Sequence, residues 1–338
     1  MSNDARPMRR IDHDQLLPGD ILLTTSLAPR SWSVRVGTGS NISHAMLYAA
    51  AASVIDSTGD GVHARNLQKL FFDDECVIYA LRPRSPLTAE QLRQVIGYAR
   101  GETGTQYSVI EAVRTLKAPR REGGSKQFCS RFVARAYAAA GIQLVESADY
   151  CTPQQLKESP LLAQRPSPAV SISNEERQSL EAQPNGVKDM TSVTNDFLDK
   201  VRKLSLEIQS INDAFQFLVE NPGVDDTVLD ALSSSGYLSY WRTELLRFPW
   251  RYRLDVMEAF SGRQIPEADL RDYCETTLEH DAAGAFRHWE DNFVLAEAHA
   301  RDFPLRSFAA MVTLYKSLVE SHQARVSVAR RWLVSHSK

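Results

Sequence analysis

The chain has 338 residues, a formal net charge of −3 and 43% hydrophobic residues. Its length suggests about two domains, and its composition is sufficient for ordinary apolar cores. The small net charge excludes a strong bulk attraction to nucleic acid or to an anionic membrane. No apolar run approaches the ~18 residues that span a bilayer, and residues 1–10 lack the apolar core of a secretory signal peptide.

The four cysteines, at positions 76, 129, 151 and 274, lie far apart in the sequence. They form no C-x-x-C pair and no spacing that is typical of a metal site, so the sequence indicates neither a disulfide framework nor a metal centre. We therefore expect reduced thiols, of which one could act as a nucleophile.

The N-terminal part of the chain predicts a flexible arm followed by short strands. Residues 1–15 are polar and are expected to be loosely attached, and a turn at 18–20 leads into a strand at 21–24. The segments 42–48 and 54–56 predict a two-stranded hairpin with His44 near the start of its first strand. Asp56 lies near the end of the second strand, so the hairpin predicts that the two side chains are cross-strand neighbours.

A second histidine, His63, follows a glycine-containing turn and is the rival to His44 as a catalytic base. It lacks the apolar pattern that flanks His44. We therefore interpret His63 as an exposed polar residue on a strand. The next elements are a strand at 77–81 and a helix at 88–100, for which Thr88 and Gln91 predict a capping box.

The segment 126–137 predicts a helix with Cys129 in its first turn. Phe132, Val133, Ala136 and Tyr137 recur at helical spacing and predict its buried face. A thiol at a helix N-terminus lies at the positive end of the macrodipole, which favours its thiolate. Unpaired backbone N–H groups at such a position could also hold an oxyanion.

Taken together, these segments resemble the NlpC-type papain-like cysteine hydrolases in their circularly permuted branch, near the YiiX-like proteins and more distantly the lecithin retinol acyltransferase-like enzymes. In permuted members the histidine strand precedes the cysteine helix, as it does here. The resemblance implies that Cys129 is the nucleophile, His44 the base and Asp56 the third polar residue, and that Tyr107 lines the substrate pocket. The matching segments are 18–23, 43–48, 54–57, 61–62, 77–82, 128–130, 136–142 and 152–156.

The predicted fold class is α+β, with a permuted papain-like domain followed by an all-helical domain. The resemblance covers roughly residues 15–165, and we place the papain-like domain at 16–165. Residues 166–188 are rich in proline and polar residues and are interpreted as a linker with at most one short helix. Residues 189–338 are expected to form a helical bundle, for which the sequence suggests no family and no catalytic motif.

Within the helical half, apolar residues from Met190 to Leu218 recur at intervals of three and four. This pattern predicts one long helix that ends at Asn221-Pro222-Gly223, packed within the chain or against a second copy, so the oligomeric state stays open. Phe248-Pro249-Trp250 predicts a kink. Further helices are expected at 225–234, 237–261, 266–278, 282–301 and 305–335.

The leading functional hypothesis is a thiol hydrolase or acyltransferase that acts through a thioester acyl-enzyme on a lipid ester or amide bond. It needs no cofactor and no metal. The protein would be made soluble in the bacterial cytoplasm, and as an antibacterial effector it would leave without a classical signal peptide. A cell-wall peptide amidase is the alternative. A non-catalytic scaffold whose C-terminal helices bind a protein partner is the alternative of another class.

Overall fold

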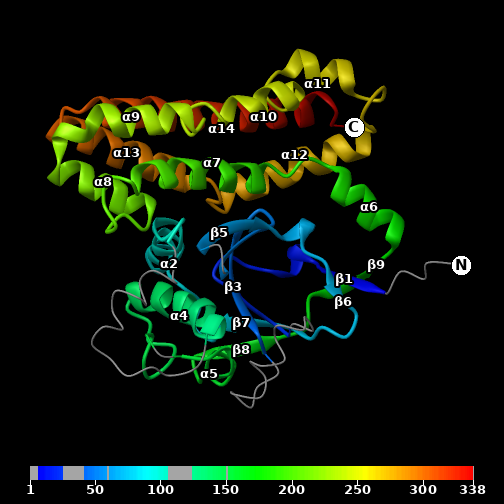
Figure 1. Ribbon diagram of the computed structural model, residues 1–338. Coiled ribbons are helices and arrows are strands. Elements are labelled where there is room, and N and C mark those ends of the chain that lie inside the picture. Colours follow the sequence, from blue (N-terminus) through cyan, green and yellow to red (C-terminus); the bar gives the residue numbers. More distant parts are fainter. Residues whose placement is uncertain (1–6, 26–41, 59–60, 106–123, 150, 338) are drawn as a thin grey trace, which may run out of the picture. The chain divides into compact units, whose positions relative to one another are not determined.

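The structure is a computed structural model that describes residues 7–25, 42–58, 61–105, 124–149 and 151–337 (Figure 1). The chain divides into two compact units, residues 1–191 with 209–212 and residues 192–208 with 213–338. Antiparallel sheets and helices make up the first unit and helices dominate the second, so the predicted α+β class is confirmed. No helix in the described ranges is both long and apolar enough to cross a membrane.

The first unit contains most of the strands of the protein. Its elements are β1 (Met8–Ile11), η1 (His13–Gln15), β2 (Ile21–Thr24), β3 (His44–Ala50), β4 (Ser53–Thr58), β5 (Gly61–Asn66), η3 (Leu67–Lys69), β6 (Phe72–Asp73), β7 (Ile78–Pro83), α2 (Ala89–Gly101), α4 (Gly124–Ala139), α5 (Pro153–Lys157), β8 (Leu162–Arg165), β9 (Ala169–Ile172) and α6 (Asn174–Ala182).

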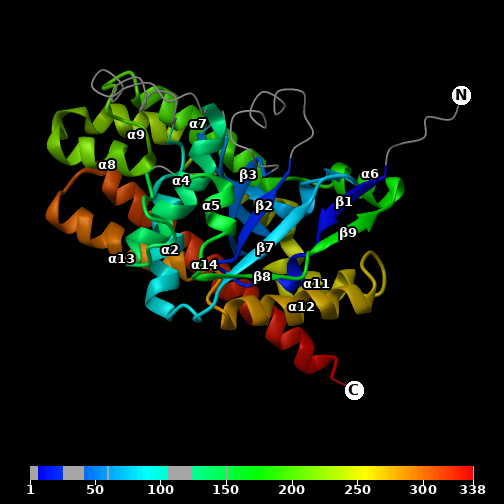
Figure 2. The ribbon, with the colours of Figure 1, turned by 90° about the horizontal axis from the view of Figure 1, so that it is seen from below.

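Six strands form an antiparallel sheet in the order β5-β4-β3-β2-β7-β8, and three form a second sheet in the order β6-β1-β9. Strand alternation gives the larger sheet two apolar faces. Leu23 and Leu47 belong to the face that packs with α2 and α4. Leu22 and Met46 belong to the other face, where Ile11 of the smaller sheet joins the core. Figures 1 and 2 show α2 and α4 on one side of the larger sheet and the smaller sheet on the other.

The β3–β4 hairpin agrees with its prediction. Ala51 and Ala52 occupy the turn with φ values of 47° and 56°, the left-handed conformation that tight hairpin turns require. The capping box of Thr88 and Gln91 is present at the start of α2. A second capping box, formed by Thr152 and Gln155, begins α5.

Two segments that were expected to be loosely structured are instead part of the first unit. Residues 7–15, predicted as a flexible arm, form β1 and η1, and β1 pairs with β9 within the predicted linker 166–188. Ile11 is 1% exposed, so β1 contributes to the core. The linker also contains α6, and the carbonyl oxygen of Gln183 after it accepts a hydrogen bond from Lys69 Nζ at 2.7 Å.

The second unit continues from α7 (Gly186–Val201), within which the division between the units falls. Its long helix α14 packs against α9, α12 and α13. The remaining elements are α8 (Ile211–Glu220), η4 (Pro222–Val224), α9 (Asp225–Ser234), α10 (Trp241–Arg247), η5 (Pro249–Arg251), α11 (Leu254–Phe260), α12 (Glu267–Ala282), α13 (Arg287–Asp302) and α14 (Arg306–Ser335).

The prediction of a single long helix from Met190 to Leu218 is wrong, because α7 ends at Val201 and α8 begins at Ile211. Side chains between them bind the backbone locally and so compete with helical hydrogen bonds. Ser205 Oγ accepts from the backbone N–H of Glu207 at 3.1 Å. The predicted break at Pro249 is confirmed: η5 separates α10 from α11.

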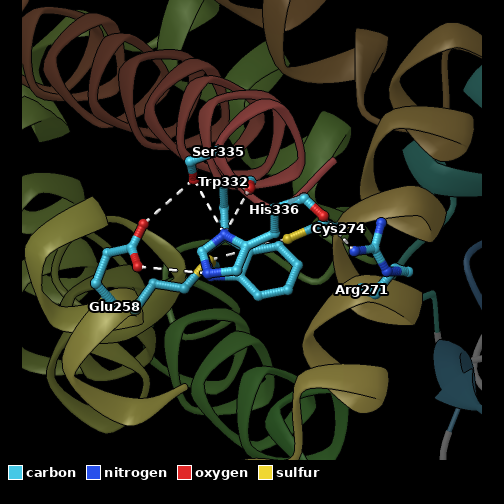
Figure 3. Close-up of polar contacts among 7 residues, drawn as sticks. Glu258, Arg271, Cys274, Trp332, Ser335 and His336 are labelled. Atoms are coloured by element: carbon cyan, nitrogen blue, oxygen red, sulfur yellow. Dashed lines mark hydrogen bonds and ion pairs between the residues drawn. The ribbon is translucent and has the colours of Figure 1, made fainter. Parts of the chain in front are cut away.

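The C-terminal end of α14 is anchored by Trp332, which is fully buried with Met257, Leu270 and Cys274. Figure 3 shows Trp332 together with Cys274, His336 and Arg271. The ring of His336 stacks on Trp332 with centroids 4.2 Å apart. The carbonyl oxygen of His336 accepts a hydrogen bond from Arg271 Nη2 at 2.7 Å. The last turn of the helix is therefore held by both packing and hydrogen bonding.

We expect Trp332→Ala to destabilise the protein by about 3–5 kcal/mol, because it removes the largest fully buried side chain and leaves a cavity. Urea unfolding followed by circular dichroism measures this loss in the helical transition. His336→Ala is the matched control, since it removes the partly exposed ring that stacks on Trp332, together with its contacts to Ser335 and Glu258. A Trp332 effect no larger than that of His336 would contradict this assignment.

Candidate active site

His44 and Asp56 meet across the β3–β4 hairpin. Met46 is the residue directly opposite Asp56, and His44 lies two positions before Met46 on β3. His44 and Asp56 are therefore a diagonal cross-strand pair, and Nε2 of His44 is 2.7 Å from Oδ2 of Asp56. The hairpin predicted this proximity from local sequence alone.

The carboxylate of Asp56 is buried and has cationic or ionisable partners on both of its oxygens. Its side chain is 1% exposed. Oδ2 contacts His44, and Oδ1 lies 3.3 Å from Nε of Arg65 on β5. A buried carboxylate needs such partners, because desolvation without them is costly.

Cys129 lies on α4, is fully buried, and is a hydrogen-bond partner of His44. It is not in a disulfide, and neither are the other three cysteines. The residue pattern alone did not predict that Cys129 meets His44, since the two residues lie far apart in the sequence; only the family resemblance implied this contact.

The electrostatics of His44 favour its protonated form. Desolvation lowers the pKa of His44, but the neighbouring Cys129 and Asp56 outweigh it and raise the pKa to about 10. His44 would therefore be an imidazolium near neutral pH. A cation of this kind next to a thiol favours the thiolate, which is the nucleophilic form of cysteine.

The start of α4 corrects the expected role of the helix terminus. The helix begins at Gly124, so Cys129 is its sixth residue and lies beyond the first turn. The macrodipole acts mainly within the first turn, and backbone N–H groups farther along bond within the helix. The predicted first-turn activation and the oxyanion hole at the Cys129 N–H are therefore not supported.

The other predicted site residues have different outcomes. Tyr107 lies outside the described residues. His63 was expected to be exposed, but it is 5% exposed and lies directly opposite Asp56 on β5. Arg65 was not considered from the sequence. Two-residue alternation places it on the same face as His63, and this signal could have found it.

Asp12, His13 and Asp14 are the one group of three or more His, Cys, Asp or Glu residues in the described ranges whose potential metal-ligand atoms all lie within 4.8 Å of one another. The cluster is explained by local structure. Asp12 caps η1 through the N–H of Asp14, and its second oxygen accepts from Gln15 Nε2 at 2.8 Å. It therefore gives no reason to assign a metal.

Comparison with known proteins identifies the class of the first unit. The family model described as "Permuted papain-like amidase enzyme, YaeF/YiiX, C92 family" matches residues 15–183. The chain therefore belongs to the permuted papain-like amidase family. This family is one of cysteine hydrolase-like proteins, and the C-terminal half lies outside the match.

A curated relative is the "Probable lipoprotein peptidase YaeF" of Escherichia coli (strain K12). It is 26% identical over 165 residues, which cover 40% of this chain and 60% of that protein. The chain thus matches less than two thirds of the length of that relative. A solved structure, "metalloprotein yiiX" from Escherichia coli O157:H7, is 18% identical, with a TM-score of 0.36. The match covers 45% of this chain and 98% of that chain.

Proposed function

We propose that this protein is a cysteine hydrolase that cleaves an amide bond through a thioester intermediate. The observation that carries the proposal is the contact of His44 with both Asp56, at 2.7 Å, and Cys129. Nucleophile, base and orienting carboxylate are recognised by this geometry rather than by their order in the chain. Membership of an amidase family supports the choice of an amide bond.

The reaction would start from the Cys129 thiolate and the His44 imidazolium. The thiolate sulfur attacks the carbonyl carbon, and His44 donates its proton to the departing amine as the C–N bond breaks. Water then attacks the thioester while His44 accepts a proton from it, the C–S bond breaks, and the free acid leaves as the Cys129 thiolate and the His44 imidazolium are regenerated. Asp56 orients the imidazole throughout through its hydrogen bond.

The leading hypothesis from the sequence allowed a lipid ester as well as an amide bond, and the same acyl-enzyme could form from a lipid ester. The family description and the relative's printed name, a probable lipoprotein peptidase, favour a peptide-like substrate instead. An acyl group held as a thioester could pass to water or to another nucleophile. Effector activity and a binding role for the C-terminal helices have no support in the site.

Mass spectrometry of the protein after incubation with three substrate classes tests the proposal. The classes are acylated peptides of lipoprotein type, cell-wall peptide fragments and phospholipid vesicles. We expect amide cleavage of one peptide class by the wild type and none by Cys129→Ala. Cleavage of phospholipid alone would replace the amidase by a lipase. No product from any class, with no acyl adduct on Cys129, would favour a scaffold.

A further inference from the structure

Asp56 lies at the centre of a polar row that crosses three adjacent strands. β3 supplies His44 on one side of Asp56, and β5 supplies Arg65 on the other. Both are diagonal neighbours of Asp56, because Met46 and His63 are the residues directly opposite it. Cross-strand diagonals of this kind lie within reach of long side chains on one face of a sheet.

The two oxygens of the carboxylate are divided between these partners. Oδ2 is 2.7 Å from His44, whereas Oδ1 accepts no hydrogen bond from the described residues and instead forms an ion pair with Nε of Arg65 at 3.3 Å. The Asp56 side chain is 1% exposed, while that of Arg65 is 40% exposed. The guanidinium therefore approaches the buried oxygen from the partly open side of the sheet, so that it can fix the carboxylate without being buried itself.

We infer that Arg65 is a positioning residue for the proposed reaction: its contact with Oδ1 holds the Asp56 carboxylate in the rotamer that directs Oδ2 at His44. This inference rests on the proposed function. An outer partner of this kind fixes the orientation of an active-site side chain and commonly affects activity by about 10- to 100-fold. Arg65 itself need not touch the substrate.

The inference predicts that loss of Arg65 lowers the pKa of His44, which a simple charge effect would not do. If Arg65 acted on His44 only as a nearby positive charge, its removal would stabilise the His44 imidazolium and raise the pKa of His44. Loss of the Asp56 rotamer instead removes the hydrogen bond to His44 and lowers the pKa. The groups that face this row are His44 and Cys129 on one side of Asp56 and His63 and Arg65 on the other.

The test follows the imidazole of His44 by nuclear magnetic resonance as a function of pH, and the Cys129 thiolate by ultraviolet absorbance, with His44→Gln and Cys129→Ala as the respective blanks. These measurements need neither a substrate nor access of a reagent to the buried thiol. We expect Arg65→Gln to move the alkaline end of the thiolate–imidazolium range downward by about one pH unit. Arg65→Lys keeps the charge without the guanidinium and should fall between Arg65→Gln and the wild type.

Arg9→Gln is the matched control, because Arg9 is a similarly half-exposed arginine of the first unit that binds a carboxylate, Asp74, through Nε at 2.6 Å. It should leave the thiolate range unchanged. If Arg65→Gln fails to fold, the shift in Arg65→Lys decides. If the range did not shift, or shifted upward, the positioning role of Arg65 would be overturned while the proposed function would stand. If the wild type showed no Cys129 thiolate, or one that did not depend on His44, the proposed function and the role of Arg65 would both be overturned.

Discussion

Replacing Cys129 by serine is expected to reduce amide hydrolysis by about four orders of magnitude or more. The hydroxyl group has nearly the size of the thiol, so the packing of α4 against the sheet is kept. An imidazolium at His44 can stabilise a neighbouring thiolate, but an alkoxide is far too basic to form in the same way. The measurement is kcat/KM on the substrate class identified by mass spectrometry, together with the acyl adduct on Cys129.

The matched control for this substitution is Cys151→Ser. Cys151 is also a fully buried thiol of the first unit, and burial raises its pKa to about 11, so it stays protonated at neutral pH. We expect Cys151→Ser to keep activity within a few-fold per folded molecule. Loss of activity in Cys151→Ser but not in Cys129→Ser would mean that Cys129 is not the nucleophile.

The parts of the site that the sequence predicted are those that local structure determines. His44 and Asp56 lie 12 positions apart on two strands joined by a tight turn, so the hairpin alone brings them together. The capping boxes at Thr88 and Thr152 are local for the same reason, because each satisfies backbone groups within one turn of helix.

The parts that the sequence did not predict depend on contacts between distant segments. β1 pairs with β6 and with β9, which lies more than 150 positions later, and neither β1 nor β9 has a pattern strong enough to be predicted alone. His63 is buried because the surrounding fold covers β5, which a short polar strand does not reveal. The break between α7 and α8 goes against a regular apolar pattern, so the tertiary context overrides the periodicity there.

We expect His44→Gln to lower kcat/KM by about 10³-fold, because it removes both the cation that favours the thiolate and the acid that protonates the departing amine. The raised pKa of His44 gives the wild type a characteristic pH dependence. The imidazolium is favoured in the folded protein, so its contribution to stability is fully present below the unfolded value of 6.5 and is lost as the pH rises through about 10.

The same sign applies to catalysis. Activity of the wild type should persist through neutral pH and decline only as the pH approaches about 10, where His44 loses its proton. Asp56→Asn removes the charge and weakens the hydrogen bond at Oδ2, so we expect it to move this alkaline decline down by about one to two pH units. A pH–rate profile of both proteins measures the shift. A decline at the same pH in Asp56→Asn would mean that Asp56 does not support the His44 imidazolium, and the carboxylate would then serve only the packing of the sheet.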